Sequence, residues 1–89
     1  MKLYKTASYN RYEKKFFKEH KDLLDKYAEV LKKLQNNPFD NSLKTHKLKG
    51  SLSEYYSCSL TYKFRLILTI KIVDDKIILV NIGNHNQVY

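Results

Sequence analysis

Residues 64–82, FRLILTIKIVDDKIILVNI, decide the fold of this 89-residue chain. Residues 64–73 are rich in isoleucine and leucine, residues 74–76 are Asp-Asp-Lys, and residues 77–82 are again largely apolar. Two apolar, β-branched runs on either side of a short polar turn are typical of a β-hairpin. We therefore expect two adjacent antiparallel strands, at least one face of which the rest of the chain has to cover.

Side chains of the 64–73 strand alternate between the two faces of the sheet. Leu66, Leu68, Ile70 and Ile72 share one face, and Arg65, Ile67, Thr69 and Lys71 share the other. The first face suits a covering layer of helices, so Arg65 is expected to point away from the helices. The strand predicted at residues 55–60 would bring Ser57 or Cys58 close to Arg65. The uncovered surface would then be basic and partly open.

Two helices are predicted after a short strand at residues 2–5. Thr6 or Ser8 can cap the first helix by accepting a backbone N–H bond. The apolar residues of this helix, at helical spacing, are Tyr9, Tyr12 and Phe16. The second helix, residues 22–36, has a stripe typical of a buried face, formed by Leu23, Leu24, Tyr27, Val30, Leu31 and Leu34. Pro38 is expected to stop this helix, because proline lacks the N–H donor and disfavours helical geometry in the residue before it.

The predicted order of elements is β-α-α-β-β-β. Residues 44–53 lie between the helices and the later strands as a basic, polar connection with a turn at Gly50. This order indicates an α+β fold in which two helices pack on one face of a mostly antiparallel sheet. No repeat, linker or change of composition divides the sequence, so we expect a single domain over residues 1–89.

The chain is strongly basic, with 17 Lys and Arg against 9 Asp and Glu and a formal net charge of +8. Such an excess favours a polyanionic partner: nucleic acid, an acidic protein or a membrane surface. No apolar run approaches the length that spans a bilayer, and nothing near Met1 resembles a signal peptide. Cys58 is the only cysteine, which excludes an internal disulfide and argues against a structural zinc site. We therefore expect a cytoplasmic protein that does not associate with membranes.

The chain ends with a polar segment that places His85 and Tyr89 four residues apart, directly after a strand. This terminal IGNHNQVY (82–89), together with HKLKGSLSEYY (46–56) and KFRLIL (63–68), resembles the RelE/ParE superfamily of bacterial type II toxins, nearest its RelE and YafQ-like branches. The resemblance covers nearly the whole chain, including the order of its elements. It implies an endoribonuclease that cleaves messenger RNA, either on the ribosome, which we expect, or free of it, and that a cognate antitoxin holds inactive.

The resemblance also implies roles for individual residues. The positions that match are His46 and His85, the acid/base histidines of the YafQ-like branch, Tyr89, its final aromatic residue, and Arg65, the strand arginine that stabilises the scissile phosphate in the RelE branch. The positions that depart are Ser59 and Lys63, where YafQ-like toxins have a histidine and an aspartate, and Tyr56 and Cys58, where RelE-type toxins have lysines. These departures leave the identity of the general base open.

RNA cleavage through the neighbouring 2′-hydroxyl requires no metal or cofactor. It needs a base for the hydroxyl proton, a cation for the charge that builds on the phosphate, and an acid for the leaving 5′-oxygen. Histidine can serve as acid or base near neutrality, and arginine binds phosphate with two donors. We expect His85 to be the general acid and Arg65 to clamp the phosphate. His46 is the candidate base, and Tyr89 is a candidate to stack on an RNA base or to orient the 2′-hydroxyl.

Lysines adjoin the predicted site in the sequence and are candidate contacts to RNA phosphates. They are Lys44, Lys47, Lys49 and Lys63. A small, acidic, partly disordered antitoxin is the expected protein partner, because such a segment can fold on a basic surface. Two alternatives stay open: a non-enzymatic gyrase inhibitor like the ParE toxins, and a basic RNA-binding module without turnover. His85 argues against the gyrase inhibitor, because the ParE branch generally lacks a histidine there.

Overall fold

The computed structural model describes residues 1–88, so Tyr89, a predicted site residue, lies outside the described residues. The strands are β1 (Lys2–Lys5), β2 (His46–Lys47), β3 (Tyr56–Ser59), β4 (Phe64–Lys71) and β5 (Lys76–Asn84), and the α-helices are α1 (Ala7–Glu19), α2 (Leu24–Asn36) and α3 (His85–Val88). Short 3₁₀ helices are η1 (Lys21–Leu23), η2 (Asn41–Leu43) and η3 (Gly50–Leu52). The predicted order is confirmed, and the two-residue β2 and the short α3 are additions to it.

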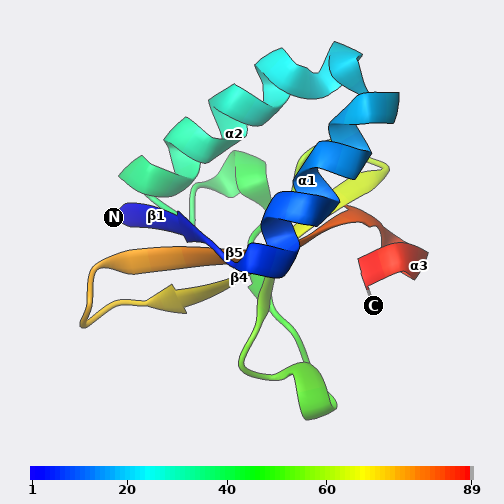
Figure 1. The fold of residues 1–89 in the computed structure, drawn as a ribbon. Coiled ribbons are helices and arrows are strands. Elements are labelled where there is room, and N and C mark those ends of the chain that lie inside the picture. Colours follow the sequence, from blue (N-terminus) through cyan, green and yellow to red (C-terminus); the bar gives the residue numbers. More distant parts are fainter. Residues whose placement is uncertain (89) are drawn as a thin grey trace.

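The five strands form one sheet in the order β1-β5-β4-β3-β2. Strand β1 runs parallel to β5, and all other neighbouring strands are antiparallel. Figure 1 shows α1 and α2 together above this sheet, with α3 near the C-terminus. The predicted α+β fold, two helices on one face of a mostly antiparallel sheet, is therefore confirmed.

The β4–β5 hairpin forms as predicted, with a tight turn at its tip. Asp75 adopts a left-handed backbone conformation (φ 54°), and its N–H donates to the carbonyl oxygen of Ile72 at 3.1 Å. Ile72 is 72% exposed, so its prediction as part of the buried face is wrong. The reason is that β4 ends before it and the chain has already left the sheet. A β-bulge interrupts the pairing of the two strands between Ile67 and Leu68.

Both helices form where their apolar spacing predicts them. Thr6 is the cap of α1, because its Oγ1 accepts the N–H of Tyr9 at 3.0 Å. Tyr12 and Leu24 were expected in the core, and this is wrong: they are 42% and 47% exposed. Tyr12 lies over the part of β5 that β1 does not reach, since β1 pairs with β5 only as far as Leu79. Leu24 is the first residue of α2, where the chain has just left η1.

The hydrophobic core lies between the helices and the sheet. The helices contribute Tyr9, Phe16, Phe17, Tyr27, Val30 and Leu34, and the two central strands contribute Phe64, Leu66, Leu68, Ile77, Leu79 and Ile82. Each of these side chains is at most 9% exposed. The core therefore uses one face of β4 and β5 and leaves the other face for a site.

A polar network crosses the edge of this core and joins both helices to β1. The hydroxyl groups of Tyr9 and Tyr27 lie 2.7 Å apart, and the Tyr27 hydroxyl donates to Glu13 Oε2. Lys5 Nζ approaches the same carboxylate oxygen at 2.8 Å. Burial, the largest cause, raises the pKa of Tyr27 well above its ordinary value, so its hydroxyl keeps the proton that it donates.

We expect Tyr27→Phe to lower the free energy of unfolding by about 1–3 kcal/mol, because it removes the donor to Glu13 and takes from the buried Tyr9 hydroxyl its partner. Urea unfolding at pH 7 measures this change. The control is Tyr12→Phe, which removes a hydroxyl from a side chain that is 42% exposed and should change stability by less than about 0.5 kcal/mol. Equal stability of the two variants would contradict a stabilising role for the network.

Candidate active site

Strand pairing fixes which way Arg65 points. Cys58 pairs with Leu66, which pairs with Ile82, and all three lie in the core beneath the helices. Arg65 is the neighbour of Leu66 along β4, so its side chain belongs to the opposite face, as predicted. Its partner on β3 is Ser59, and the Arg65 guanidinium donates to Ser59 Oγ. The expectation that Ser57 or Cys58 lies opposite Arg65 is therefore wrong by one or two positions.

The register follows from the connection between β3 and β4, residues 60–63, which closes tightly. The N–H groups of Leu60 and Thr61 both donate to the carbonyl oxygen of Phe64, at 3.0 and 3.2 Å. Directly outside this tight turn the paired residues of the two strands are Ser59 and Arg65. Ser59, which the resemblance matches to a histidine of the YafQ-like branch, accepts a hydrogen bond from the guanidinium.

His46 lies on the same face as Arg65. It pairs with Ser57, which in turn pairs with Ile67, and residues opposite one another on neighbouring strands share a face. The His46 side chain is exposed, and its Nδ1 lies 3.0 Å from the carbonyl oxygen of Lys44. A carbonyl oxygen only accepts, so Nδ1 carries the proton and donates it. This leaves Nε2 as the proton acceptor of the neutral ring.

His85 is the first residue of α3 and follows β5 directly. The chain position two residues before it, Gly83, pairs with Arg65, and α3 packs against β4 and β5. The His85 side chain is exposed. Strand pairing thus brings the start of α3 next to the face that carries Arg65 and His46. Tyr89, the fourth predicted catalytic residue, lies outside the described residues.

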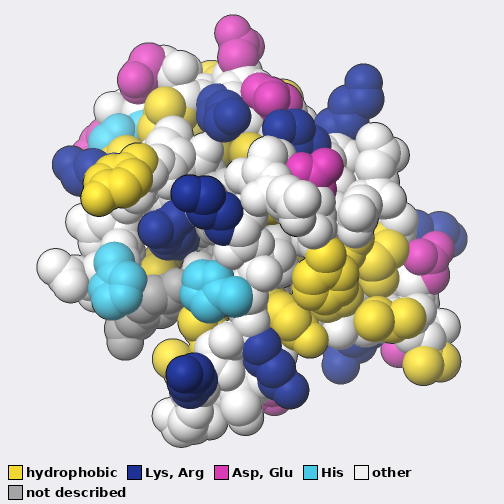
Figure 2. All heavy atoms as spheres, turned by 180° about the vertical axis from the view of Figure 1, so that it is seen from behind, with side chains coloured by type: hydrophobic (Ala, Val, Ile, Leu, Met, Phe, Trp, Pro, Cys, Tyr) yellow, Lys and Arg dark blue, Asp and Glu magenta, His cyan; other side chains and the backbone are white. Residues whose placement is uncertain are grey.

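Not all of the predicted lysines join this face. Lys44 and Lys63, which lie in the connections before β2 and β4, are both exposed. Lys63 Nζ lies 5.4 Å from the centre of the Phe64 ring. Lys47 pairs with Tyr56 and therefore belongs to the face opposite that of His46. Lys49 is exposed just before η3, which projects from the sheet (Figure 1). On the face seen in Figure 2, two histidine side chains lie close together with Lys and Arg side chains beside them.

Cys58 is not a candidate nucleophile. Its side chain is fully buried in the core between β3 and the helices. Burial raises the pKa of its thiol to about 12, although the nearby Arg65 charge acts in the opposite direction. The thiol therefore stays protonated at neutral pH and contributes to packing.

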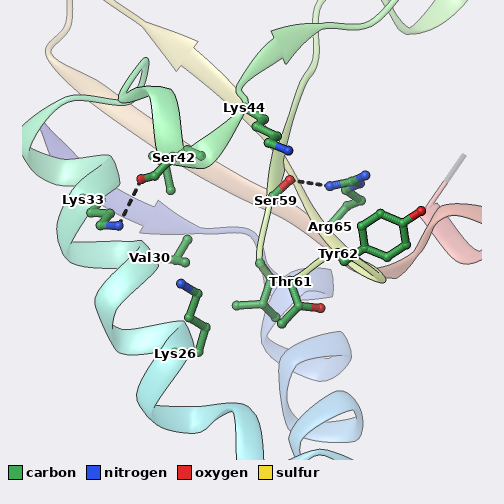
Figure 3. A pocket seen from close by; sticks show the side chains of 11 residues that line it. Lys26, Val30, Lys33, Ser42, Lys44, Ser59, Thr61, Tyr62 and Arg65 are labelled. Atoms are coloured by element: carbon green, nitrogen blue, oxygen red, sulfur yellow. Dashed lines mark hydrogen bonds between the residues drawn. The ribbon is translucent and has the colours of Figure 1, made fainter.

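A hollow of about 280 Å³ adjoins Arg65 where β3 runs past the end of β2 (Figure 3). Its walls come from α2, from η2 and the residue after it, and from the turn between β3 and β4. The polar side chains that line it are Lys26, Lys33, Ser42, Lys44, Ser59, Thr61, Tyr62 and Arg65, over a floor of Val30, Leu43 and Leu60. Sequence reasoning missed Lys26, Lys33 and Tyr62, although Lys26, Val30 and Lys33 are spaced as one helical face.

The model of a known protein family, described as the bacterial toxin of type II toxin-antitoxin system, YafQ, matches residues 1–89. The chain belongs to the YafQ toxin family. The resemblance to the RelE/ParE superfamily is thereby confirmed, and of the two branches expected, RelE and YafQ-like, the matching family is the YafQ-like one. A comparison with curated protein sequences finds no match.

Solved structures of bacterial toxins share the fold of this chain. YafQ from E. coli strain BL21(DE3) is 21% identical and has the same fold, with a TM-score of 0.82 over 98% of this chain and 96% of that one. A copper-bound mutant toxin from Helicobacter pylori is 25% identical, with a TM-score of 0.79 over 100% and 99% of the chains. The YoeB-YefM complex from Staphylococcus aureus contains a chain that is 26% identical, with a TM-score of 0.76 over 96% and 97%.

Two further properties of this YafQ-family chain concern residues 1–88. None of its helices in that range is long and apolar enough to cross a membrane. Within the same residues, His, Cys, Asp and Glu side chains do not gather in threes that could hold a metal ion.

Proposed function

We propose that this chain is the toxin of a type II toxin-antitoxin system and acts as an endoribonuclease that cleaves messenger RNA on the ribosome. The observation that supports this best is that strand pairing puts Arg65 and His46 on the same face of the sheet, opposite the helices, with His85 directly after the end of β5. A cation and two proton-transfer groups are what metal-free RNA cleavage requires. The proposed setting is the cytoplasm, where messenger RNA is translated.

In the proposed reaction the 2′-oxygen of the RNA attacks the neighbouring phosphorus, and the bond from phosphorus to the 5′-oxygen breaks. Nε2 of His46 takes the proton of the 2′-hydroxyl. It is free to accept because the proton of the neutral ring is on Nδ1, which donates to the carbonyl oxygen of Lys44. His85 gives a proton to the leaving 5′-oxygen. Arg65, held by Ser59, binds the phosphate oxygens on which negative charge builds. The products are a 2′,3′-cyclic phosphate and a 5′-hydroxyl, and no metal or cofactor takes part.

Three of the four predicted lysines fit the proposed RNA site. Lys63 directly precedes β4, Lys44 extends toward Ser59 and Arg65 (Figure 3), and Lys49 precedes the projecting η3 segment, so each can contact a backbone phosphate. Lys47 is proposed as a weaker, peripheral contact because its pairing directs it to the other face. Tyr89 keeps its proposed role of stacking on an RNA base or orienting the 2′-hydroxyl.

A cognate antitoxin is the proposed protein partner. Solved relatives include a DinJ-YafQ complex from E. coli and a YoeB-YefM complex from Staphylococcus aureus. The net charge of +8 favours an acidic partner, and exposed apolar side chains such as Tyr12 and Phe39 offer it apolar contacts. A partly disordered segment would gain order by covering this surface.

The product ends test the proposed function. When the purified chain is added to ribosomes that are translating a defined messenger RNA, we expect cuts that carry 2′,3′-cyclic phosphate and 5′-hydroxyl ends. Mapping of the ends by adapter ligation, with and without enzymatic removal of the cyclic phosphate, measures this. Intact messenger RNA together with inhibited DNA supercoiling by gyrase would instead support the ParE-like alternative. Binding of RNA without any cleavage would support a binding module.

A further inference from the structure

The hollow beside Arg65 has the chemistry of an anion site. Four cationic side chains reach it from three separate parts of the fold, Lys26 and Lys33 from α2, Lys44 from the end of η2, and Arg65 from β4. Four residues with hydroxyl-bearing side chains, Ser42, Ser59, Thr61 and Tyr62, also line it. Among the described residues that line it, none is acidic. Its volume of about 280 Å³ is below that of most sites for complete small-molecule ligands.

The positive charge of the hollow is only partly balanced within the chain. Glu29 is the carboxylate that pairs with both α2 lysines, at 3.3 Å from Lys33 and 3.8 Å from Lys26. These pairs are exposed, with the Glu29 side chain 52% accessible, and exposed ion pairs are weak and easily exchanged. In the part of the chain that the structure describes, neither Lys44 nor Arg65 forms an ion pair. A ligand with negative charge would therefore gain from binding here.

An exposed aromatic ring stands at the rim of the same hollow. Tyr62, in the turn between β3 and β4, is 97% exposed and lies next to Arg65 in Figure 3. A fully exposed tyrosine adds nothing to the core of this fold. Aromatic rings beside grouped cations are what proteins use to bind single-stranded nucleic acid, since the ring stacks on a base while the cations hold the backbone.

Lys44 has a backbone conformation that lysine disfavours. Its φ of 52° is in the left-handed region, which glycine and asparagine adopt more easily than lysine. The Lys44 side chain extends toward Ser59 and Arg65 (Figure 3). The lysine is thus unfavourable for local folding, and its ammonium group adds positive charge to the hollow.

We propose that this hollow binds the phosphate of the RNA nucleotide next to the cleaved one, and that Tyr62 stacks on the base of that nucleotide. The inference rests on the proposed ribonuclease function, and it extends the RNA site from the sheet to α2. Arg65 forms a wall of the hollow and also belongs to the catalytic face, so consecutive phosphates can lie on its two sides. An acidic antitoxin segment is the competing occupant, and RNA is favoured because Arg65 joins the hollow to the proposed cleavage site.

Binding of a non-cleavable RNA tests this site separately from the chemistry. The probe is a fluorescein-labelled hexanucleotide with 2′-O-methyl groups, titrated with the full chain at several salt concentrations. For the double variant Lys26→Ala/Lys33→Ala we expect weaker binding and a shallower slope of log K against log salt, by about 0.7 for each phosphate that the variant no longer neutralises. The control is Lys32→Ala, which removes an exposed lysine from the same helix outside the hollow and should change neither quantity.

Two single variants sharpen the test. Tyr62→Ala should weaken binding of the same probe roughly tenfold, with little change in the salt slope, because stacking carries no charge. Lys44→Asn should fold at least as stably as the wild type, since asparagine tolerates the left-handed conformation, and should still bind RNA more weakly. Opposite signs for stability and binding would not arise if Lys44 had only a structural role.

The possible results separate this inference from the function on which it rests. Unchanged RNA binding by the double variant and by Tyr62→Ala would overturn the subsite, even if the wild type cleaves messenger RNA. Weaker binding in these variants would support it, even if the wild type proved unable to cleave. Reduced affinity for an antitoxin obtained by coexpression with the chain, with RNA affinity unchanged, would assign the hollow to the antitoxin and also overturn the inference.

Discussion

Replacing His85 with alanine is expected to slow cleavage of an RNA substrate by about 10²- to 10⁴-fold, the usual contribution of one general acid. Single-turnover cleavage of a labelled messenger RNA fragment, under the same conditions as for the wild type, measures the rate. The fold should survive the substitution, because His85 is exposed at the start of α3 and belongs to no part of the core. Asn86→Ala, the exposed neighbour in the same helix, is the control and should cleave at nearly the wild-type rate.

A modified substrate can show that His85 acts as an acid. If sulfur replaces the leaving 5′-oxygen, the bond to phosphorus breaks without protonation, since a thiol is far more acidic than an alcohol. His85→Ala should then cleave the sulfur substrate at close to the wild-type rate. His46→Ala should cleave both substrates slowly, because a base is still required for the 2′-hydroxyl. An equal decrease on both substrates for His85→Ala would contradict the assignment of His85 as the acid.

The second large effect is expected at Arg65. Arg65→Ala should lower the cleavage rate by about 10²- to 10³-fold, the decrease that follows removal of a preorganised charge partner of the transition state. Its affinity for the 2′-O-methyl hexanucleotide should fall much less, because the ground-state phosphate keeps its lysine contacts. Arg65→Lys should recover only part of the rate, since an ammonium group lacks the two parallel donors of a guanidinium.

Controls on the same sheet separate charge from position. Lys71→Ala removes a cation from the far end of β4, roughly 20 Å along the strand from Arg65, and should leave the rate unchanged. Ser59→Ala removes the hydroxyl that receives the Arg65 hydrogen bond and should give a smaller decrease than Arg65→Ala. A decrease for Lys71→Ala as large as for Arg65→Ala would show that overall charge, and not the placed guanidinium, determines the rate.

Most of the fold was predictable because its signals are local. The cap at Thr6, the stripe of α2 and the two halves of the β4–β5 hairpin each follow from a spacing within a few residues. Tyr12 and Leu24 could not be placed correctly, because their exposure depends on where β1 stops covering β5 and where η1 ends and α2 begins. These features are not contained in the spacing of apolar residues along one helix, so that spacing does not predict them.

The sequence names candidate members of the site but does not give their geometry. His46, Arg65 and His85 came from a match of motifs, but β2 has only two residues and gives no periodic signal. The pairing of His46 with Ser57, and of Ser59 with Arg65, therefore required the coordinates. The α2 lysines looked like an ordinary solvated face, since their neighbours in the hollow from the strands lie far from them in the sequence.

The bulge between β4 and β5 has a consequence for every residue that follows it. Leu68 pairs with Leu79 and Ile67 pairs with Asn81, so Val80 is an extra residue without an opposing residue on β4. Because of it, Leu79 and Ile82 both face the core although they stand an odd number of positions apart. If the same sequence paired without the bulge, every residue after Val80 would lie on the opposite face of the sheet. The C-terminal histidine would then emerge beneath the helices, so one unpaired valine sets the phase of the candidate site.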